Sequence, residues 1–389
     1  MRSRSDLYTP TFWLACAVHF TGAMSIAMLY LVPLFVARLG GDELLIGLLI
    51  GVGMGASVGM RPAVGWLLDG WGRRAVLAAG GVLNAATIPP FLALSTLGAG
   101  LWAVTLLHLV AAGVLFAAYF AYVADLVPAA RRAEGFAIFG SAGILPNGLG
   151  PALGEWLIAH AGFPAFFLAA TAFATLSLLL TLRLPATRHA AEGHAAGAAG
   201  AVTTLFGGGL APILVMTLVF GACVEVVFYF VAPYAAAAGA GPVGPVFVAY
   251  ATATMAVRVL GRRVLDTLGP QRTAGPAFVC YALGLTLLAT RPAWALLVVA
   301  GIACGLGHGT LFPVLGALAI ARTPPRLRGT AMSLYTGAVE GGGVVGTPIA
   351  GALARALGYP AMFGLMAAVS LGGAALVRLD ARRTADPAP

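Results

Sequence analysis

The feature that most constrains this chain is a succession of long apolar runs joined by short polar connections. Each run has room for the roughly 20 apolar residues that a helix needs to cross the hydrocarbon core of a bilayer. Because 60% of the 389 residues are hydrophobic and only 9% are charged, polar residues are too few to cover a water-soluble protein of this length. The sequence therefore predicts an all-α membrane protein with twelve transmembrane helices.

The expected helices form two sets of six, separated by an Ala- and Gly-rich stretch at 185–208 that we interpret as a flexible cytoplasmic linker. An N-terminal bundle is expected at 1–184 and a C-terminal bundle with a short cytoplasmic tail at 209–389. The expected helices are 11–37, 43–67, 75–97, 101–124, 134–159, 163–183, 209–237, 243–264, 273–290, 294–320, 330–356 and 360–378.

All 22 basic residues are arginines, and their distribution predicts an orientation. With a cytoplasmic N-terminus, 19 of them fall on the cytoplasmic side and 3 on the opposite side. Arginine-rich short loops stay on the cytoplasmic side of a membrane. Both termini are therefore expected in the cytoplasm and the chain in the inner (plasma) membrane, and the formal charge of +9 needs no nucleic-acid partner.

The two halves share residues in the same order, mostly at an offset of 197. Such a series indicates an internal repeat, and two parallel six-helix repeats are a transporter architecture. The pairs at this offset are Arg61 and Arg258, Asp69 and Asp266, Gly72 and Gly269, Pro128 and Pro325, Arg131 and Arg328, Pro151 and Pro348, and Gly154 and Gly351.

The connection after the second expected helix carries a charged motif, Gly65-x-x-x-Asp69-x-x-Gly72-Arg73-Arg74. The glycines permit a tight turn and close helix approach, the aspartate at a membrane boundary needs a cation or a helix N-terminus, and the arginine offers a forked donor.

This motif resembles the helix 2–3 signature of the major facilitator superfamily, and the resemblance extends over essentially the whole chain. It implies twelve helices in two pseudo-symmetric halves and transport by alternating access. It also implies that Asp69 and Arg73 form a cytoplasmic latch with Asp125, at the end of the fourth helix. The alternative is that these charges only set the topology. The gating residues expected on this basis are Arg61, Gly65, Asp69, Gly72, Arg73, Asp125, Arg131 and Asp266.

Two further runs resemble branches of the same superfamily. Gly150-Pro151-x-x-Gly154 partly matches the Gly-Pro motif of efflux-type antiporters, although Glu155 replaces the final glycine and the helix 4 arginine of many antiporters is absent. We expect Glu155 to be solvated near the outer end of its helix. The run around His308 is similar to the sugar-efflux and multidrug-efflux-like branches.

Ionisable groups at membrane depth usually mark a transport pathway. Glu225, His308 and Glu340 all fall near the middle of an expected helix in the second half. The resemblance places Glu225 and His308 on the central cavity, and Glu340 within reach of it. The alternatives are a protonated structural carboxyl for Glu225, capture of Glu340 by neighbouring glycine amides, and a packed histidine at 308.

His19, His108, Asn147 and Tyr229 complete the candidate transport residues. For the two histidines and the tyrosine, the alternative is ordinary packing. For Asn147, it is satisfaction of the carbonyl that the adjacent proline leaves free.

The function expected from these features is proton-coupled efflux of a small organic solute by antiport, with Glu225 as the coupling carboxylate. The expected cavity carries carboxylates and no mid-helix arginine, which favours cationic, zwitterionic or neutral solutes. The alternatives are an importer of a nutrient or metal chelate and a non-transporting membrane sensor. Since the sequence has no nucleotide-binding loop, hydrolase motif or paired metal-ligand spacing, we expect no enzyme activity, cofactor or metal. The protein is expected to be a monomer in contact with membrane lipid.

Overall fold

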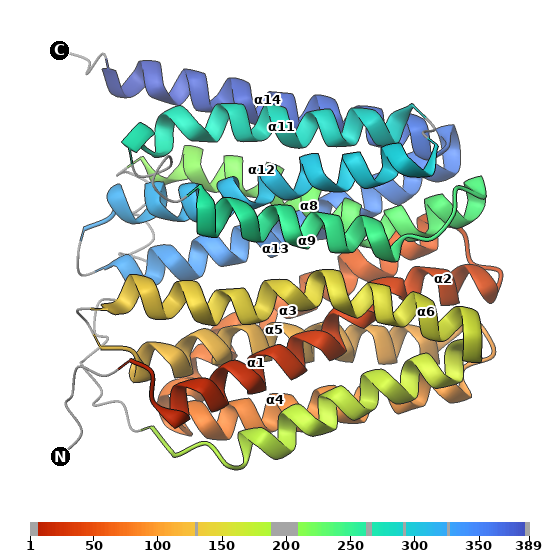
Figure 1. Cartoon of the computed structure of the whole chain (residues 1–389), viewed down its shortest axis with the longest axis horizontal. Helices are drawn as coiled ribbons and strands as arrows, with labels where there is room; N and C mark the ends of the chain where they lie inside the picture. Colours follow the sequence, from red (N-terminus) through yellow and green to blue (C-terminus); the bar gives the residue numbers. More distant parts are fainter. Residues whose placement is uncertain are drawn as a thin grey trace. The chain divides into compact units, whose positions relative to one another are not determined.

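A computed structural model of the chain describes residues 7–128, 131–187, 209–261, 267–290, 293–324 and 327–385. Its described part contains helices and no strand (Figure 1). The α-helices are α1 Pro10–Met28, α2 Val32–Arg38, α3 Glu43–Gly70, α4 Arg73–Thr87, α5 Ala99–Leu126, α6 Arg132–Thr181, α8 Leu210–Ala238, α9 Gly244–Leu260, α11 Pro270–Ala289, α12 Trp294–Ala321, α13 Arg328–Leu357 and α14 Tyr359–Ala385.

These helices supply the twelve predicted spans. Within the described residues, nine helical stretches are long and apolar enough to cross a membrane by themselves. One of them, α6, contains two spans, because the backbone at Gly162 leaves the helical region with φ at 76°. The shorter α9 and the glycine-rich α13 account for the other two. The chain is thus an all-α membrane protein with two six-helix halves.

Prolines and glycines determine where several helices end, and hydropathy predicts these positions less well. The helix predicted at 75–97 ends at Thr87 and continues as a 3₁₀ turn, Pro89–Ala93. Adjacent prolines lack the N–H groups that would continue an α-helix. The helix predicted at 243–264 is described only to Leu260, since 262–266 lie outside the described residues, as does most of the predicted linker.

By contacts the chain divides into two units, and each takes in a short segment of the other half. Unit 1 comprises Met1–Gly41, Val52–Glu192 and Val243–Val248; unit 2 comprises Asp42–Gly51, Gly193–Pro242 and Ala249–Pro389. The predicted bundle boundaries at 184 and 209 stay a prediction.

Unit 1 is built on long contacts of α1 with α6 and of α4 with α5. It holds its segment Val243–Val248 through Glu155 on α6. The two carboxylate oxygens of Glu155 accept hydrogen bonds of 2.7 and 2.6 Å from the backbone N–H groups of Val243 and Gly244. The prediction of a solvated Glu155 is therefore wrong, because its carboxylate satisfies the free N–H groups at the start of α9.

Unit 2 packs α8 along α13, and α11 between α12 and α14. It holds its segment Asp42–Gly51 through Thr347, whose hydroxyl donates to the carbonyl of Gly47 at 3.1 Å, and through an ion pair of 3.2 Å between Arg355 and Asp42.

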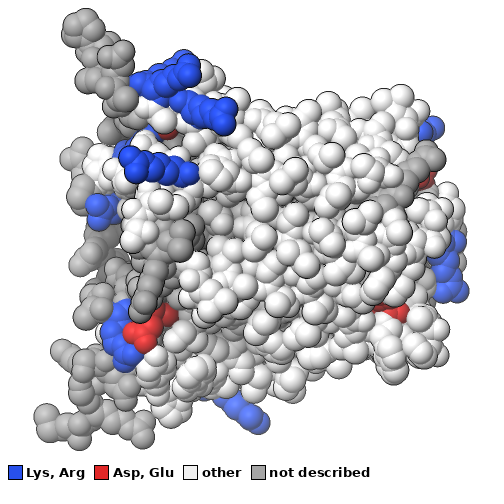
Figure 2. Space-filling model, turned by 45° about the horizontal axis from the view of Figure 1, so that its top comes forward, with Lys and Arg blue, Asp and Glu red and all other residues white. Residues whose placement is uncertain are grey.

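Charged side chains are sparse along the sides of the helices. Figure 2 shows a broad stretch of uncharged residues, with basic and acidic atoms gathered mainly at its two ends. This distribution is what a chain surrounded by hydrocarbon requires.

Two ion pairs of unit 2 differ in burial. Arg322, at the end of α12, pairs with Asp380 of α14 through both carboxylate oxygens and donates a hydrogen bond of 3.1 Å to the carbonyl of Gly209. The side chains of Arg322 and Asp380 are only 15% and 8% exposed, whereas those of Arg355 and Asp42 are 57% and 43% exposed.

We predict that Asp380→Asn lowers the free energy of unfolding by about 3–5 kcal/mol, because it leaves a buried guanidinium without its counter-ion. Asp42→Asn removes an exposed pair and should cost about 1 kcal/mol or less. Thermal unfolding of the two purified variants beside the parent measures this difference. Equal losses of stability in the two variants would show that the buried pair of Arg322 and Asp380 contributes no more to stability than the exposed pair.

Candidate functional site in the second unit

Glu225 and Glu340 come together in unit 2 because their helices approach very closely. A Cβ atom added at Gly221 of α8 would lie 2.0 Å from the carbonyl oxygen of Val339 on α13, and one added at Gly342 would lie 2.3 Å from that of Leu218. Only glycine fits at such contacts. Both carboxyl groups are half-buried and near enough to interact electrostatically.

His308 of α12 lies in an aromatic and polar cluster of the same unit. Its Nδ1 and the hydroxyl of Tyr250 on α9 are hydrogen-bonded at 2.6 Å. The ring of Phe220 on α8 meets the imidazole edge-on, with 5.3 Å between centroids. Tyr281 of α11 contacts the Tyr250 hydroxyl through its own hydroxyl, at 3.5 Å. The histidine is therefore tied to a hydroxyl network rather than packed only against apolar side chains.

Arg258 joins this cluster, and sequence reasoning missed its role. It lies in the last turn of α9, with its guanidinium carbon 5.3 Å from the centre of the Phe312 ring. It interacts electrostatically with His308 and with the hydroxyls of Tyr250 and Tyr335. Its Nε is buried and has no hydrogen-bond partner among the described residues.

The expected absence of a mid-helix arginine is not contradicted, because Arg258 lies in the last turn of α9, but an arginine does reach the cluster around His308. Arg258 is one of the arginines expected on the cytoplasmic side, and it packs against the ring of Phe312 in unit 2. The available signal was its place inside an apolar run, at the repeat position of Arg61. Unit 2 thus carries a pair of acids and, beside His308, a cation.

The arrangement has two chemical capacities. Two carboxyl groups within electrostatic reach of each other can together attract the cationic group of a solute. A guanidinium among tyrosine hydroxyls is a donor group for an anionic or polar part of a solute. Tyr229 lies one helical turn after Glu225 on α8 and is buried. Among the described residues, no three His, Cys, Asp or Glu side chains gather as a metal site.

The candidate residues of unit 1 have a different environment. His19 is buried between the rings of Tyr119 and Phe139, with centroids 4.7 and 4.4 Å away, and its Nδ1 lies 3.1 Å from the carbonyl oxygen of Phe139. This geometry matches the packing alternative for His19.

His108 and Asn147 are the two other candidates of unit 1. His108 is buried on α5, and its Nδ1 has no hydrogen-bond partner among the described residues. Asn147 is half-buried on α6 beside Pro146. These surroundings do not show whether His108 or Asn147 binds solute, so their part in transport stays a prediction.

The expected latch residues lie together in unit 1. Arg73, at the start of α4, donates to the carbonyl of Leu68 at 2.8 Å and to Oδ1 of Asp69 at 3.1 Å. Its Nε lies 3.6 Å from Oδ2 of Asp125. The side chains of Arg73 and Asp125 are 11% and 10% exposed, whereas that of Asp69 is 66% exposed. Asp125 is therefore the buried counter-ion of Arg73.

The other expected gating residues are placed separately. Gly72 has φ at 86°, which suits the predicted turn, but a Cβ at Gly65 would meet no atom of the described residues within 4 Å, so the predicted close approach is not found there. Arg61 is half-buried in α3. Arg131 pairs with Glu134 at 2.8 Å and covers the ring of Tyr8. Asp266 lies outside the described residues.

Comparisons with known proteins agree with this architecture. The chain matches the family model of the Major Facilitator Superfamily at residues 12–245 and again at 238–389. An uncharacterised MFS-type transporter of Burkholderia mallei (strain SAVP1) is 32% identical over 127 residues, which are 33% of this chain and 31% of the relative. One of Salmonella typhimurium (strain LT2) is 31% identical over 134 residues, 34% of each chain. The matched stretches thus span about a third of these curated relatives.

Solved structures share the fold at low sequence identity. The nucleoside transporter NupG has a TM-score of 0.76 at 16% identity, over 96% of this chain and 100% of its own. A D-xylose-proton symporter has a TM-score of 0.77 at 16% identity, over 94% of this chain and 96% of its own. With two family matches that together cover nearly the whole chain, this protein belongs to the Major Facilitator Superfamily.

Proposed function

We propose that the protein is a proton-coupled antiporter that exports a small organic solute across the inner membrane. The observation that carries the proposal is the acid pair of Glu225 and Glu340, which the glycine contact of α8 with α13 holds within electrostatic reach. A proton-coupled transporter needs a group that binds the proton, and a pair of carboxyl groups at membrane depth can be such a group.

Coupling follows from competition for this pair. A proton lowers the repulsion between the two carboxyl groups, and so does a cationic group of a solute. When each excludes the other, one conformational cycle moves a proton in and a solute out. Glu225 is the main coupling carboxylate in this scheme, because it lies midway along α8, with Glu340 of α13 as its partner.

The proposed solute is small and zwitterionic or neutral and polar, with a purely cationic solute less favoured than the sequence suggested. The reason is Arg258, which places a guanidinium and tyrosine hydroxyls near His308 in the same unit as the acids. Two structures with this fold carry the names of a nucleoside transporter and a D-xylose-proton symporter, which are in keeping with polar solutes and protons. We also propose a monomer with both termini in the cytoplasm.

The second candidate is symport, by which a nutrient enters with the proton. The likeness to a D-xylose-proton symporter favours it. Symport requires that the proton and the solute bind together, whereas antiport requires that they exclude each other. A rise in solute affinity on protonation would support symport, and a fall would support antiport.

The proposed orientation predicts the outcome of reporter fusions. Fusions at Ala186 and after Pro389 should report the cytoplasm, and a fusion at Ala293 the periplasm, because 19 of 22 arginines lie on the side of the termini. A periplasmic signal after Pro389 would overturn this orientation.

The proposed latch predicts that Asp125→Asn has a larger effect than Asp69→Asn. Asp125 is the buried partner of Arg73, and water screens Asp69 more strongly. Both variants should turn over more slowly, still bind solute, and show faster labelling of a cysteine introduced on the cytoplasmic side. Unchanged labelling and normal transport in both variants would mean that these charges only set topology.

The proposed coupling role predicts that Glu225→Gln affects proton-driven uphill transport and solute exchange differently. The amide mimics the protonated acid, so flux driven uphill by a pH gradient should be lost, while solute exchange at equal pH should partly survive. Glu340→Gln should have the smaller effect. The measurement is transport in proteoliposomes, with a solute first selected by ligand-induced thermal shift from zwitterionic, neutral and cationic compounds.

The matched glutamine variants separate the possible outcomes. Full uphill transport by Glu225→Gln would remove it from the coupling step. Loss in Glu340→Gln alone would move that role to α13. Loss of both uphill flux and exchange, with thermal stability retained, would place Glu225 in solute binding rather than in coupling.

A further inference from the structure

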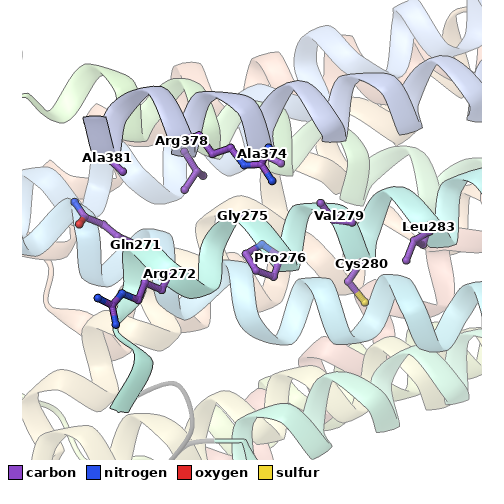
Figure 3. A pocket seen from close by; sticks show the side chains of 11 residues that line it. Gln271, Arg272, Gly275, Pro276, Val279, Cys280, Leu283, Ala374, Arg378 and Ala381 are labelled. Atoms are coloured by element: carbon purple, nitrogen blue, oxygen red, sulfur yellow. The ribbon is translucent and has the colours of Figure 1, made fainter. Parts of the chain in front are cut away.

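A groove on unit 2, between α11 and α14, has no part in the proposed transport site. Its volume is about 430 Å³, and eleven described residues line it. Figure 3 shows Arg272 and Arg378 towards one end of the groove and Leu283 at the other. Apart from these arginines and Gln271, the lining is Gly275, Pro276, Val279, Cys280, Leu283, Ala374, Val377 and Ala381.

The length of the groove matches one leaflet of a bilayer. From Arg272 to Leu283 the helix α11 rises about 16 Å, at roughly 1.5 Å per residue. Half of the hydrocarbon core is about 15 Å thick. An extended acyl chain that lies against Pro276, Val279 and Leu283 would therefore run from the membrane boundary to the middle of the bilayer.

The boundary end of the groove is positively charged. Both arginine side chains are exposed, and the eleven described residues of the lining include no acid. Asp380, two residues after Arg378, faces Arg322 instead and is buried by that ion pair. The guanidinium groups of Arg272 and Arg378 therefore offer forked donors to an anion at the depth of lipid phosphates.

The backbone provides one more polar group at the same end. Pro276 lies inside α11 and has no N–H, so the carbonyl of Arg272 does not receive the α-helical hydrogen bond from position 276. This acceptor lies beside the arginine that would bind a phosphate, where it can take a hydrogen bond from a glycerol hydroxyl of a headgroup.

We propose that this groove is a binding site for an anionic phospholipid, with one acyl chain against α11 and α14 and the phosphate at the end of the groove that carries Arg272 and Arg378. Basic pockets between transmembrane helices at the cytoplasmic boundary bind such headgroups. The lining of the groove does not include Glu225, so the lipid proposal can be tested independently of proton coupling.

The test is native mass spectrometry of the purified full chain with phosphatidylglycerol or phosphatidylethanolamine, together with thermal unfolding in each lipid. The parent should retain phosphatidylglycerol preferentially. Each arginine near the headgroup contributes about a fivefold preference, so the double variant Arg272→Gln/Arg378→Gln should lose a preference of about 25-fold. Arg382→Gln/Arg383→Gln removes the same charge from exposed positions outside the groove and should retain it.

A second pair of variants tests the apolar part of the groove. Among the described residues, a Cβ at Gly275 would meet only Val377, at 4.0 Å, so Gly275→Leu can fill the groove without disturbing the backbone. It should lower retention of both lipids. The control is Gly372→Leu, on α14 but outside the groove, where an added Cβ would meet no atom of the described residues within 4 Å.

Three results would overturn the proposal. Equal loss of phosphatidylglycerol in the Arg382/Arg383 control would mean attraction to diffuse surface charge. Normal lipid retention by Gly275→Leu would mean that no acyl chain occupies the groove. Displacement of the lipid by millimolar glycerol 3-phosphate or inorganic phosphate would mean a site for a free phosphate, since a site that needs the acyl chain resists these competitors.

Discussion

Hydrocarbon offers no partner to a backbone N–H or carbonyl group, so each span must satisfy these groups within its own helix. Helices in lipid also gain little from burying apolar side chains against one another, and close backbone contact takes over that role. The approach of α8 to α13 at Gly221 and Gly342 is such a contact. It also fixes the distance between Glu225 and Glu340. The candidate site thus depends on a packing contact that contains no functional group.

The number and order of spans could be predicted because hydropathy alone decides what can cross a bilayer. The ends were harder to predict. Gly162 divides α6 where two predicted helices meet, but Pro89 ends α4 well before the apolar run ends. Hydropathy averages over a window, whereas one missing N–H acts at one residue. The same limit applies to Glu155, whose carboxylate is held by two backbone N–H groups some ninety residues away in the chain.

The candidate site could be predicted only in part, for a related reason. Depth along a helix follows from residue number, and depth selected Glu225, Glu340 and His308. Residue number does not show which faces of two helices contact each other, because a helix that is apolar all round has no amphipathic pattern to orient it. Arg258 was missed on this account: near the end of its helix it has the position of a topology signal, and only the packing of Phe312 beneath its guanidinium distinguishes the two cases.

The two repeats use equivalent positions in opposite ways. At the offset of 200 that aligns Phe20 with Phe220 and Pro33 with Pro233, Glu225 corresponds to Ser25, which is fully buried and accepts a hydrogen bond from Asn84. At the offset of 197, Glu340 corresponds to Gly143, where an added Cβ would lie 2.5 Å from the ring of His19. In unit 1 these two positions pack closely against neighbouring side chains, and in unit 2 the equivalent positions carry glutamates. Each ionisable group at membrane depth is costly, so a repeat that bears several of them gives up packing that its counterpart retains. This asymmetry is the physical reason to look for the coupling chemistry in the second half.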